Sequence, residues 1–364
     1  MFSEFFNLYG NGKWWLAGLY VDPTTRAFTY PFAYPPTSLP FFGFFALFGF
    51  GIAAQLWTAM SLAAFAIASL GLFFVVDSKR RYLFASIASL LFFTSYPLQL
   101  ELHLGQINLL IGSLTVLSLV CQRMQHRFAS AALLAVGTMM KGPPVLFLIY
   151  FVAFRRDLRY LVDFLICCLV GFGLSLLVVP IQLYSYWIVN IVPTLFVGSG
   201  VEINESIMRP LTQSNSAYLT PMILLAGVCL CAALAFYVNS HRFKGLQRSS
   251  LSADAMFLMN TLVILFLGSR SWPQDYVWVI LPAALFLSGL MMEDVKIAYF
   301  ALIGVATFLV NFNTYPIFPY YLNFPITMIP TGLVGSVLMF IALVLYYLRH
   351  GTILPNEHSI NSKT

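Results

Sequence analysis

The segment Phe32-Ala-Tyr-Pro-Pro36 divides the chain into two parts of different composition. Its two consecutive prolines fix the backbone and remove two N–H donors, so we expect no helix there. Residues 1–36 form a polar stretch, which we interpret as a loop, and apolar runs begin directly after it. The loop contains several charged, amide and indole side chains: Glu4, Asn7, Asn11, Lys13, Trp14, Trp15, Asp22 and Arg26.

The composition is that of a membrane protein. Hydrophobic residues make up 60% of the chain, charged residues 9%, and the mean hydropathy is +0.85, whereas soluble domains contain about 25% charged residues. The net charge of +6 does not indicate nucleic-acid binding, because the basic residues lie in short segments between apolar runs, where they act as topology signals. The five cysteines lie within apolar runs without metal-ligand spacing, so neither a metal nor a cofactor is expected.

The apolar runs predict an all-α, polytopic transmembrane helical bundle. A spanning helix needs about 20 mostly apolar residues. Residues 38–50 are shorter and predict a half-helix, and the run 129–154 is interrupted at Lys141-Gly-Pro-Pro144, which predicts two short helices meeting at a polar tip. We expect about 11 crossings in one domain, 1–350, and a disordered cytoplasmic tail, 351–364. The full spans are predicted at 52–76, 83–98, 105–121, 161–180, 216–238, 255–269, 276–291, 297–311 and 332–348.

The basic segments predict the orientation in the membrane. Residues 77–81, 122–127, 155–159 and 241–248 and the tail from Arg349 are separated by even numbers of crossings, so all are expected in the cytoplasm. We therefore expect a multi-pass protein of the cell (inner) membrane, without a cleavable signal peptide, whose active face is extracytoplasmic. The outer segments hold most of the unusual polar residues: 1–36, 99–104, the Lys141 tip, 182–215, 269–275 and 312–331.

Several of these outer residues are candidates for chemistry. Glu4 is either a general base, with a pKa raised by neighbouring phenylalanines, or an exposed terminal carboxylate. Gln106 and Asn108 are either a helix cap and an interhelical hydrogen bond, or ligands of sugar hydroxyls, which amides suit as both donors and acceptors. Lys141 either reaches the interface or binds a phosphate. Further positive or hydrogen-donating groups of the kind that an anionic lipid requires are His103, Arg209 and Arg270. Trp272, which follows Arg270 closely, is either a site residue or an interfacial tryptophan.

An ordered set of short motifs resembles glycosyltransferase family 87, from about residue 3 to residue 290. They are Glu4-Phe-Phe, Tyr34-Pro-Pro-Thr-Ser-Leu, Gly105-Gln-Ile-Asn-Leu-Leu110, Lys141-Gly-Pro-Pro, Asn204-Glu-Ser206 with Arg209, and Ser271-Trp272 followed by Tyr276-Val-Trp and Leu281-Pro282. The resemblance implies a membrane enzyme of the GT-C fold that uses a polyprenyl-phosphate sugar, usually mannose. The chain departs from the family at Glu4, where an aspartate is usual, and at Gln274-Asp275, where two histidines are usual. Family members also begin with a spanning helix before the first loop, so we expect either a start codon assigned too far downstream or a truncated member.

The resemblance implies a mechanism and assigns roles to the candidates. Glu4 takes a proton from an acceptor hydroxyl, which attacks the anomeric carbon with inversion, and polyprenyl phosphate leaves without help from a metal. The acceptor is a lipid or a glycan, and the tail of the donor enters between helices from the membrane lipids. The residues expected to bind substrate are Tyr34, Gln106, Asn108, Lys141, Arg209, Arg270, Trp272 and Gln274.

Two other hypotheses remain open at this point. Broken helices around Lys141 also suit a secondary transporter, although no inverted repeat is found. The departure at Glu4 also suits an inactive partner in glycan export. No glycine-rich nucleotide loop or Asp-x-Asp pair occurs, so cytosolic nucleotide-sugar chemistry is not expected.

Overall fold

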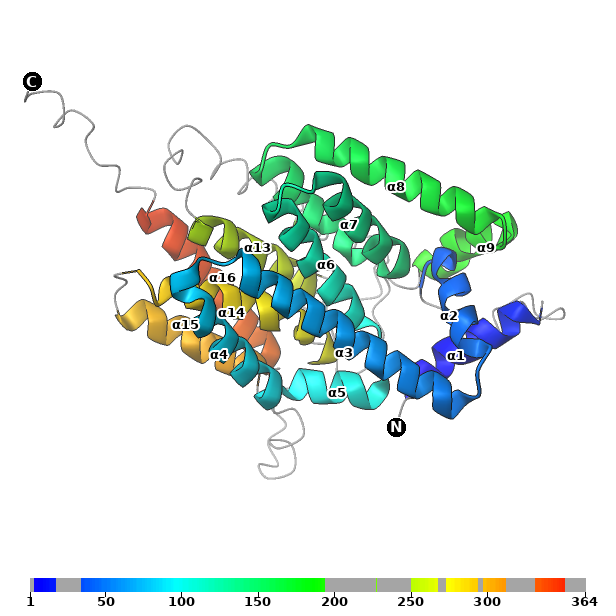
Figure 1. The fold of residues 1–364 in the computed structure, drawn as a ribbon, viewed down its shortest axis with the longest axis horizontal. Coiled ribbons are helices and arrows are strands. Elements are labelled where there is room, and N and C mark those ends of the chain that lie inside the picture. Colours follow the sequence, from blue (N-terminus) through cyan, green and yellow to red (C-terminus); the bar gives the residue numbers. More distant parts are fainter. Residues whose placement is uncertain are drawn as a thin grey trace, which may run out of the picture.

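The structure is a computed structural model, which describes residues 3–17, 34–193, 227, 250–267, 273–293, 297–311 and 331–350. Within these ranges every regular element is a helix (Figure 1), which confirms the predicted all-α class. The first part of the chain forms α1 (Ser3–Leu16), α2 (Leu39–Ala46), α3 (Phe50–Val75), α4 (Ser78–Thr94), α5 (Tyr96–Leu104), α6 (Asn108–Arg123), α7 (Arg127–Lys141), η2 (Pro143–Phe147), η3 (Ile149–Phe154), α8 (Leu158–Leu176), α9 (Ile181–Tyr186) and η4 (Trp187–Ile191). The second part forms α13 (Ser250–Leu267), η7 (Pro273–Val279), α14 (Ile280–Leu290), α15 (Ile297–Asn311) and α16 (Thr331–His350).

The N-terminal segment is helical where a loop was predicted. Phe5, Leu8, Tyr9 and Gly12 follow the i, i+3, i+4, i+7 spacing of one helix face and are buried. The Phe5 ring stacks on Trp57 of α3 at a centroid distance of 5.1 Å. A Cβ atom on Gly12 would lie 2.6 Å from the Phe42 carbonyl oxygen, so glycine allows α1 to cross α2 closely. This aromatic packing, rather than a run of apolar residues, stabilises α1.

The diproline segment behaves as its chemistry predicts. Pro35 has an extended backbone, and Pro36 begins a short 3₁₀ helix, η1 (Pro36–Ser38), that leads into α2. The Thr37 hydroxyl donates to the Met139 carbonyl oxygen over 2.5 Å, which ties this segment to α7. The half-helix predicted at 38–50 is therefore α2, and the full helix after it is α3.

The central layer of the bundle is α6, which packs between α3 and α7, while α8 covers the other side of α7 (Figure 1). α4 packs on α14, α15 on α16, and α13 on both α14 and α16. By length and apolar composition α3 and α8 each suffice to cross a membrane, and the bent pair α4–α5 is a third candidate. Six further apolar helical stretches of 10–17 residues lie within the described residues. The number of crossings and the span at 216–238, which lies outside the described residues, stay predictions, as do the boundary and the tail at 351–364.

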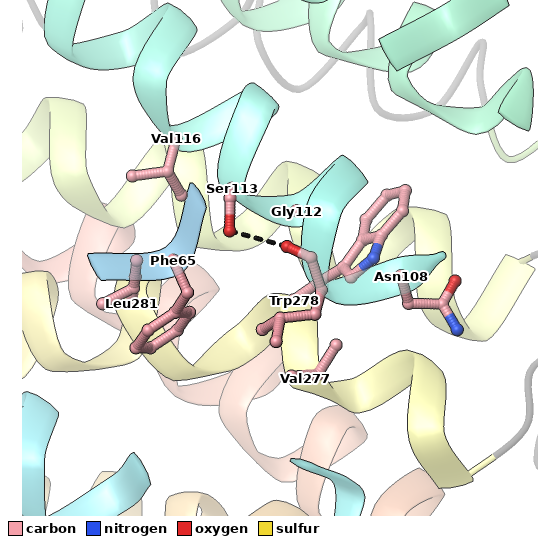
Figure 2. A pocket seen from close by; sticks show the side chains of 9 residues that line it. Phe65, Asn108, Gly112, Ser113, Val116, Val277, Trp278 and Leu281 are labelled. Carbon is pink, nitrogen blue, oxygen red and sulfur yellow. Dashed lines mark hydrogen bonds between the residues drawn. The ribbon is translucent and has the colours of Figure 1, made fainter. Parts of the chain in front are cut away.

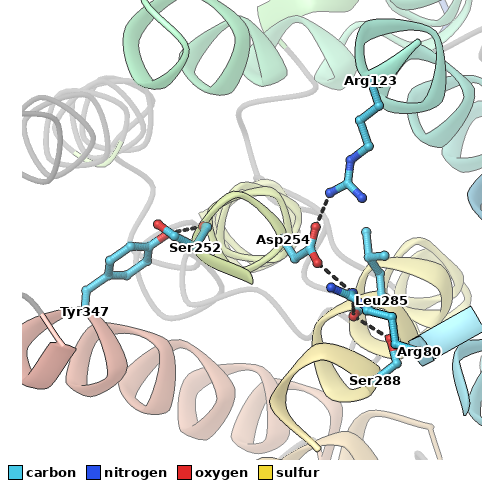
Figure 3. Close-up of polar contacts among 7 residues, drawn as sticks. All are labelled: Arg80, Arg123, Ser252, Asp254, Leu285, Ser288 and Tyr347. Carbon is cyan, nitrogen blue, oxygen red and sulfur yellow. Dashed lines mark hydrogen bonds and ion pairs between the residues drawn. The ribbon is translucent and has the colours of Figure 1, made fainter. Parts of the chain in front are cut away.

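A buried ionic cluster at the C-terminal end of α6 joins four helices, α4, α6, α13 and α14 (Figure 3). The Asp254 carboxylate, fully buried on α13, accepts from Arg80 Nη2 of α4 over 2.7 Å and from Arg123 Nη2 at the end of α6. Arg80 Nη2 also donates to the Leu285 carbonyl oxygen of α14 over 2.5 Å. Arg80 and Arg123, predicted only as topology signals, both take part in the packing of the bundle. Their predicted cytoplasmic position is a separate prediction.

The substitution Asp254→Asn tests how much this cluster stabilises the fold. It leaves the buried Arg80 guanidinium and the partly exposed Arg123 guanidinium without their shared counter-charge, and breaking a buried pair in this way destabilises by about 3–5 kcal/mol. We expect the midpoint of thermal unfolding in detergent to fall by several degrees.

The matched control is Asp163→Asn, which breaks the Arg127–Asp163 pair of 2.6 Å. Those side chains are 38% and 16% exposed, and exposed pairs contribute about 0–1 kcal/mol. An equal decrease of the unfolding midpoint in both variants would show that the Asp254 cluster stabilises the fold no more than the exposed pair does.

Candidate active site

The turn between α5 and α6 brings an acidic side chain back onto the start of the next helix. α5 begins at the Ser95 cap, whose hydroxyl accepts from Leu98 N over 3.2 Å, and ends at Gly105, whose φ of +68° is readily adopted only by glycine. Glu101 Oε1 then accepts from the backbone N–H of Leu109 over 2.9 Å. A carboxylate at this position also interacts favourably with the positive end of α6. The predicted outer loop at 99–104 is thus part of a helix.

Asn108, the first residue of α6, is the centre of a buried hydrogen-bond network. Its Nδ2 donates to Glu101 Oε2 over 3.0 Å and to Gln106 Oε1 over 2.8 Å. Its Oδ1 accepts from Lys141 Nζ at the end of α7. Lys141 Nζ also donates to Asp275 Oδ1 on η7 over 3.0 Å. The side chains come from α5, the α5–α6 turn, α6, α7 and η7, so the network fixes how these elements meet.

The direction of Lys141 follows from the break in its helix. Gly142 has φ +66° and ends α7, and the two prolines after it begin η2, as the sequence predicted. The ammonium group lies 5.9 Å from the centre of the Trp278 ring, near the outer limit of a cation–π contact. Lys141 therefore contacts carboxylate, amide and indole inside the bundle instead of extending away from it.

The charged and amide side chains of this network have little contact with water. Glu101 and Asn108 are 1% and 0% exposed, and Asp275 is buried too. Buried polar groups are strongly destabilising unless hydrogen-bonded, and satisfied networks are correspondingly rigid. The Lys141 ammonium, expected to bind a phosphate, has two oxygen partners already. An anionic ligand at this point would have to share the ammonium with Asp275.

The structure brings together part of the predicted site. Gln106, Asn108 and Lys141 meet in one network. Asn108 makes the predicted interhelical hydrogen bond, with Lys141, but neither amide caps α6, because Ile107 holds the cap position. Sugar binding by the two amides stays a prediction. Gln274 is buried on η7 next to Asp275. Tyr34 instead packs its ring on Phe42 of α2 at a centroid distance of 6.0 Å. Arg209, Arg270 and Trp272 lie outside the described residues, as does the side chain of Glu4. The helix that carries Glu4, α1, contacts α5.

Glu101 and Asp275 are the residues whose part in the network sequence reasoning missed. A signal for Glu101 was present, because an acidic residue within an apolar segment is by default a candidate for function. Asp275 had been noted only as a departure from the histidines of the family. Among the side chains that the structure describes, no group of three or more His, Cys, Asp or Glu residues is arranged to hold a metal ion.

An apolar helical bundle in which α3 and α8 are each long and apolar enough to cross a membrane is typical of a membrane protein. The family model of glycosyltransferase family 87 matches residues 32–269, more than half of the chain, and the protein therefore belongs to this family and is a membrane glycosyltransferase. The matched range contains Tyr34, Gln106, Asn108, Lys141 and Arg209. Glu4 precedes it, and Arg270, Trp272, Gln274 and Asp275 follow it. No curated protein matches the chain.

The substitution Glu101→Ala tests the role of the network in the enzyme. It removes the acceptor of both Leu109 N–H and Asn108 Nδ2, and each buried donor left without a partner is destabilising by about 1–3 kcal/mol. Because Asn108 loses its orientation, we expect sugar transfer to fall by at least about tenfold, together with a lower unfolding midpoint.

The control is Gln99→Ala in the same helix, where the side chain is exposed. We expect this variant to keep both activity and stability. Wild-type transfer by Glu101→Ala would show that the network does not support catalysis.

Proposed function

We propose that this glycosyltransferase moves a sugar, in the first instance mannose, from a polyprenyl-phosphate donor to a lipid or glycan acceptor on the extracytoplasmic side of the cell membrane. The observation that supports this most is the Glu101–Asn108–Lys141–Asp275 network. It places amide, carboxylate and ammonium groups inside an apolar bundle. There they can bind a sugar attached to a membrane lipid while the lipid tail stays in the bilayer. Amides and carboxylates are suited to the hydroxyl groups of a sugar.

The proposed reaction is an inverting displacement. The Glu4 carboxylate takes the proton of an acceptor hydroxyl, and the hydroxyl oxygen forms a bond to the anomeric carbon. The bond between that carbon and the phosphate oxygen breaks, and polyprenyl phosphate leaves with the electron pair. Glu4 lies on α1, which contacts α5, the helix that carries Glu101. The proposed base, Glu4, and the network residue Glu101 thus lie on two helices that contact each other, α1 and α5.

Positive side chains then stabilise the departing phosphate. Lys141 takes part only by sharing its ammonium with Asp275, since these two groups are 3.0 Å apart. Arg209 and Arg270, outside the described residues, are the other cations proposed for this role. In the proposed complex, Gln106 and Asn108 bind the sugar, and the two arginines make most of the contacts to the phosphate group.

The substitution Glu4→Gln tests the proposed base. A positioned general base contributes about 10²- to 10⁴-fold to a rate, so we expect kcat to fall by that factor. The assay follows labelled mannose from polyprenyl-phosphate mannose into the glycolipid and glycan fractions of membranes that contain the protein.

Lys13→Gln is the matched control, because it also removes one charge from α1, from an exposed position. Near-normal turnover by Glu4→Gln would remove Glu4 from the mechanism. Donor binding without any turnover by the wild-type protein would instead favour the inactive export partner.

The proposed orientation makes a separate prediction. In a background without native cysteines, Gln99→Cys on α5 is expected to react with a membrane-impermeant maleimide in intact cells. Lys79→Cys on α4 is expected to react only after permeabilisation. Both positions are exposed. The reverse labelling pattern would place the network on the cytoplasmic side and contradict the proposed donor.

A further inference from the structure

A small cavity adjoins the network on the side of η7 (Figure 2). It lies between α3, α6, η7 and α14, and has room for about one water-sized group. Most of its lining is apolar, with Asn108 and Trp278 at one end. Because Asn108 belongs both to the cavity and to the network, a group bound here touches the candidate site. The remaining lining residues are Phe65, Leu109, Gly112, Ser113, Val116, Val277 and Leu281.

Trp278 contributes a buried donor with no acceptor. The side chain is 5% exposed, and its Nε1 has no hydrogen-bond partner among the described residues. The hydroxyl of Ser113, which also lines the cavity, is by contrast satisfied by the Leu109 carbonyl oxygen at 2.6 Å. A buried donor without a partner is unfavourable. The missing acceptor must then come from a bound group, either a buried water or a ligand.

The Trp278 indole packs against Gly112 of α6 and lies near Lys141. A Cβ atom on Gly112 would lie 3.1 Å from Trp278 Cδ1 and 3.4 Å from Cγ, so the glycine lets the ring pack directly on α6. The Lys141 ammonium lies 5.9 Å from the ring centre. Figure 2 shows the ring between Gly112 and Asn108. The position of the indole therefore depends on Gly112 and on its neighbours Asn108 and Lys141 in the network.

We propose that the indole N–H of Trp278 donates a hydrogen bond to an oxygen atom of the bound lipid-linked sugar, which makes Trp278 a substrate-binding residue. This inference rests on the proposed function. The acceptor is either a hydroxyl oxygen of the sugar or a phosphate oxygen, and both offer the same hydrogen-bonding chemistry. The size of the cavity fits one such oxygen, and its apolar walls strengthen a hydrogen bond made inside it.

The direct test observes the indole N–H itself. The chain has six tryptophans, so protein labelled with ¹⁵N-tryptophan in detergent micelles gives a small set of indole signals. The Trp278 signal is the one absent from Trp278→Phe and displaced in Gly112→Ala, which gives a second assignment if the first variant does not fold. Polyprenyl phosphate and an alkyl mannoside are then added separately to the wild-type protein.

We expect the Trp278 signal to move with at least one ligand, while the other indole signals serve as internal references. Movement with polyprenyl phosphate assigns the phosphate oxygen, and movement with the mannoside assigns a sugar hydroxyl. A signal that moves with neither ligand, nor with polyprenyl-phosphate mannose, overturns the inference and leaves the N–H to a buried water. An unmoved signal in a protein that transfers mannose refutes the role of Trp278 alone, whereas a moving signal without transfer refutes the proposed reaction alone.

Kinetics provide an independent readout. Losing one hydrogen bond corresponds to about a 2- to 12-fold effect on binding for a neutral sugar hydroxyl and about a 12- to 160-fold effect for a charged phosphate oxygen. Trp278→Phe is therefore expected to raise KM for the donor by at least about twofold, with a smaller change in kcat. Gly112→Ala is expected to act in the same direction by displacing the ring. The control is Trp187→Phe, because Trp187 Nε1 also lacks a partner among the described residues but lies on η4, which contacts α9. An unchanged KM in Trp278→Phe contradicts the proposal.

Discussion

The carboxamide of Asn108 is the group on which the arrangement of the site depends. It donates to Glu101 and Gln106 with its nitrogen and accepts from Lys141 with its oxygen. Only an amide offers donors and an acceptor on one short side chain. An aspartate here would place a third carboxylate beside Glu101 and Asp275, and a leucine would leave several buried groups without partners. The meeting of α5, α6, α7 and η7 thus depends on a single side chain.

α6 connects this site to the rest of the bundle because a polar cluster lies at each of its ends. Asn108 begins the helix, and Arg123, paired with Asp254, ends it. Sixteen residues at 1.5 Å each separate the clusters by about 24 Å, somewhat less than the roughly 30 Å of a bilayer core. Between them, Ser113 and Thr115 donate to carbonyl oxygens of their own helix. Both the depth and the rotation of α6 are therefore fixed by ionic contacts at its ends and by apolar packing in between.

Local sequence signals predicted the helical class, most helix positions and the break at Lys141, because apolar runs and Gly-Pro-Pro act within a few residues. The same reasoning missed α1, whose polar residues outweigh an apolar face made of widely spaced aromatic side chains. It also missed the partners of Arg80 and Lys141, since Asp254 and Asp275 lie more than 130 residues further along the chain. Such pairings depend on the packing of helices. In the site, residue types predicted Gln106, Asn108 and Lys141, but only the packing adds Glu101, Asp275 and Trp278.

The balance of hydrogen bonds in the site determines how a ligand can enter it. The ammonium of Lys141, the amide of Asn108 and the carboxylate of Glu101 satisfy one another, so a substrate binds them only by exchanging partners. Such an exchange needs little reorganisation, because the groups are already desolvated and oriented. The indole N–H of Trp278 differs, because among the described residues it has no partner to give up. A ligand oxygen can therefore accept a hydrogen bond from Trp278 without breaking one in the protein, and Asn108 lines the same cavity.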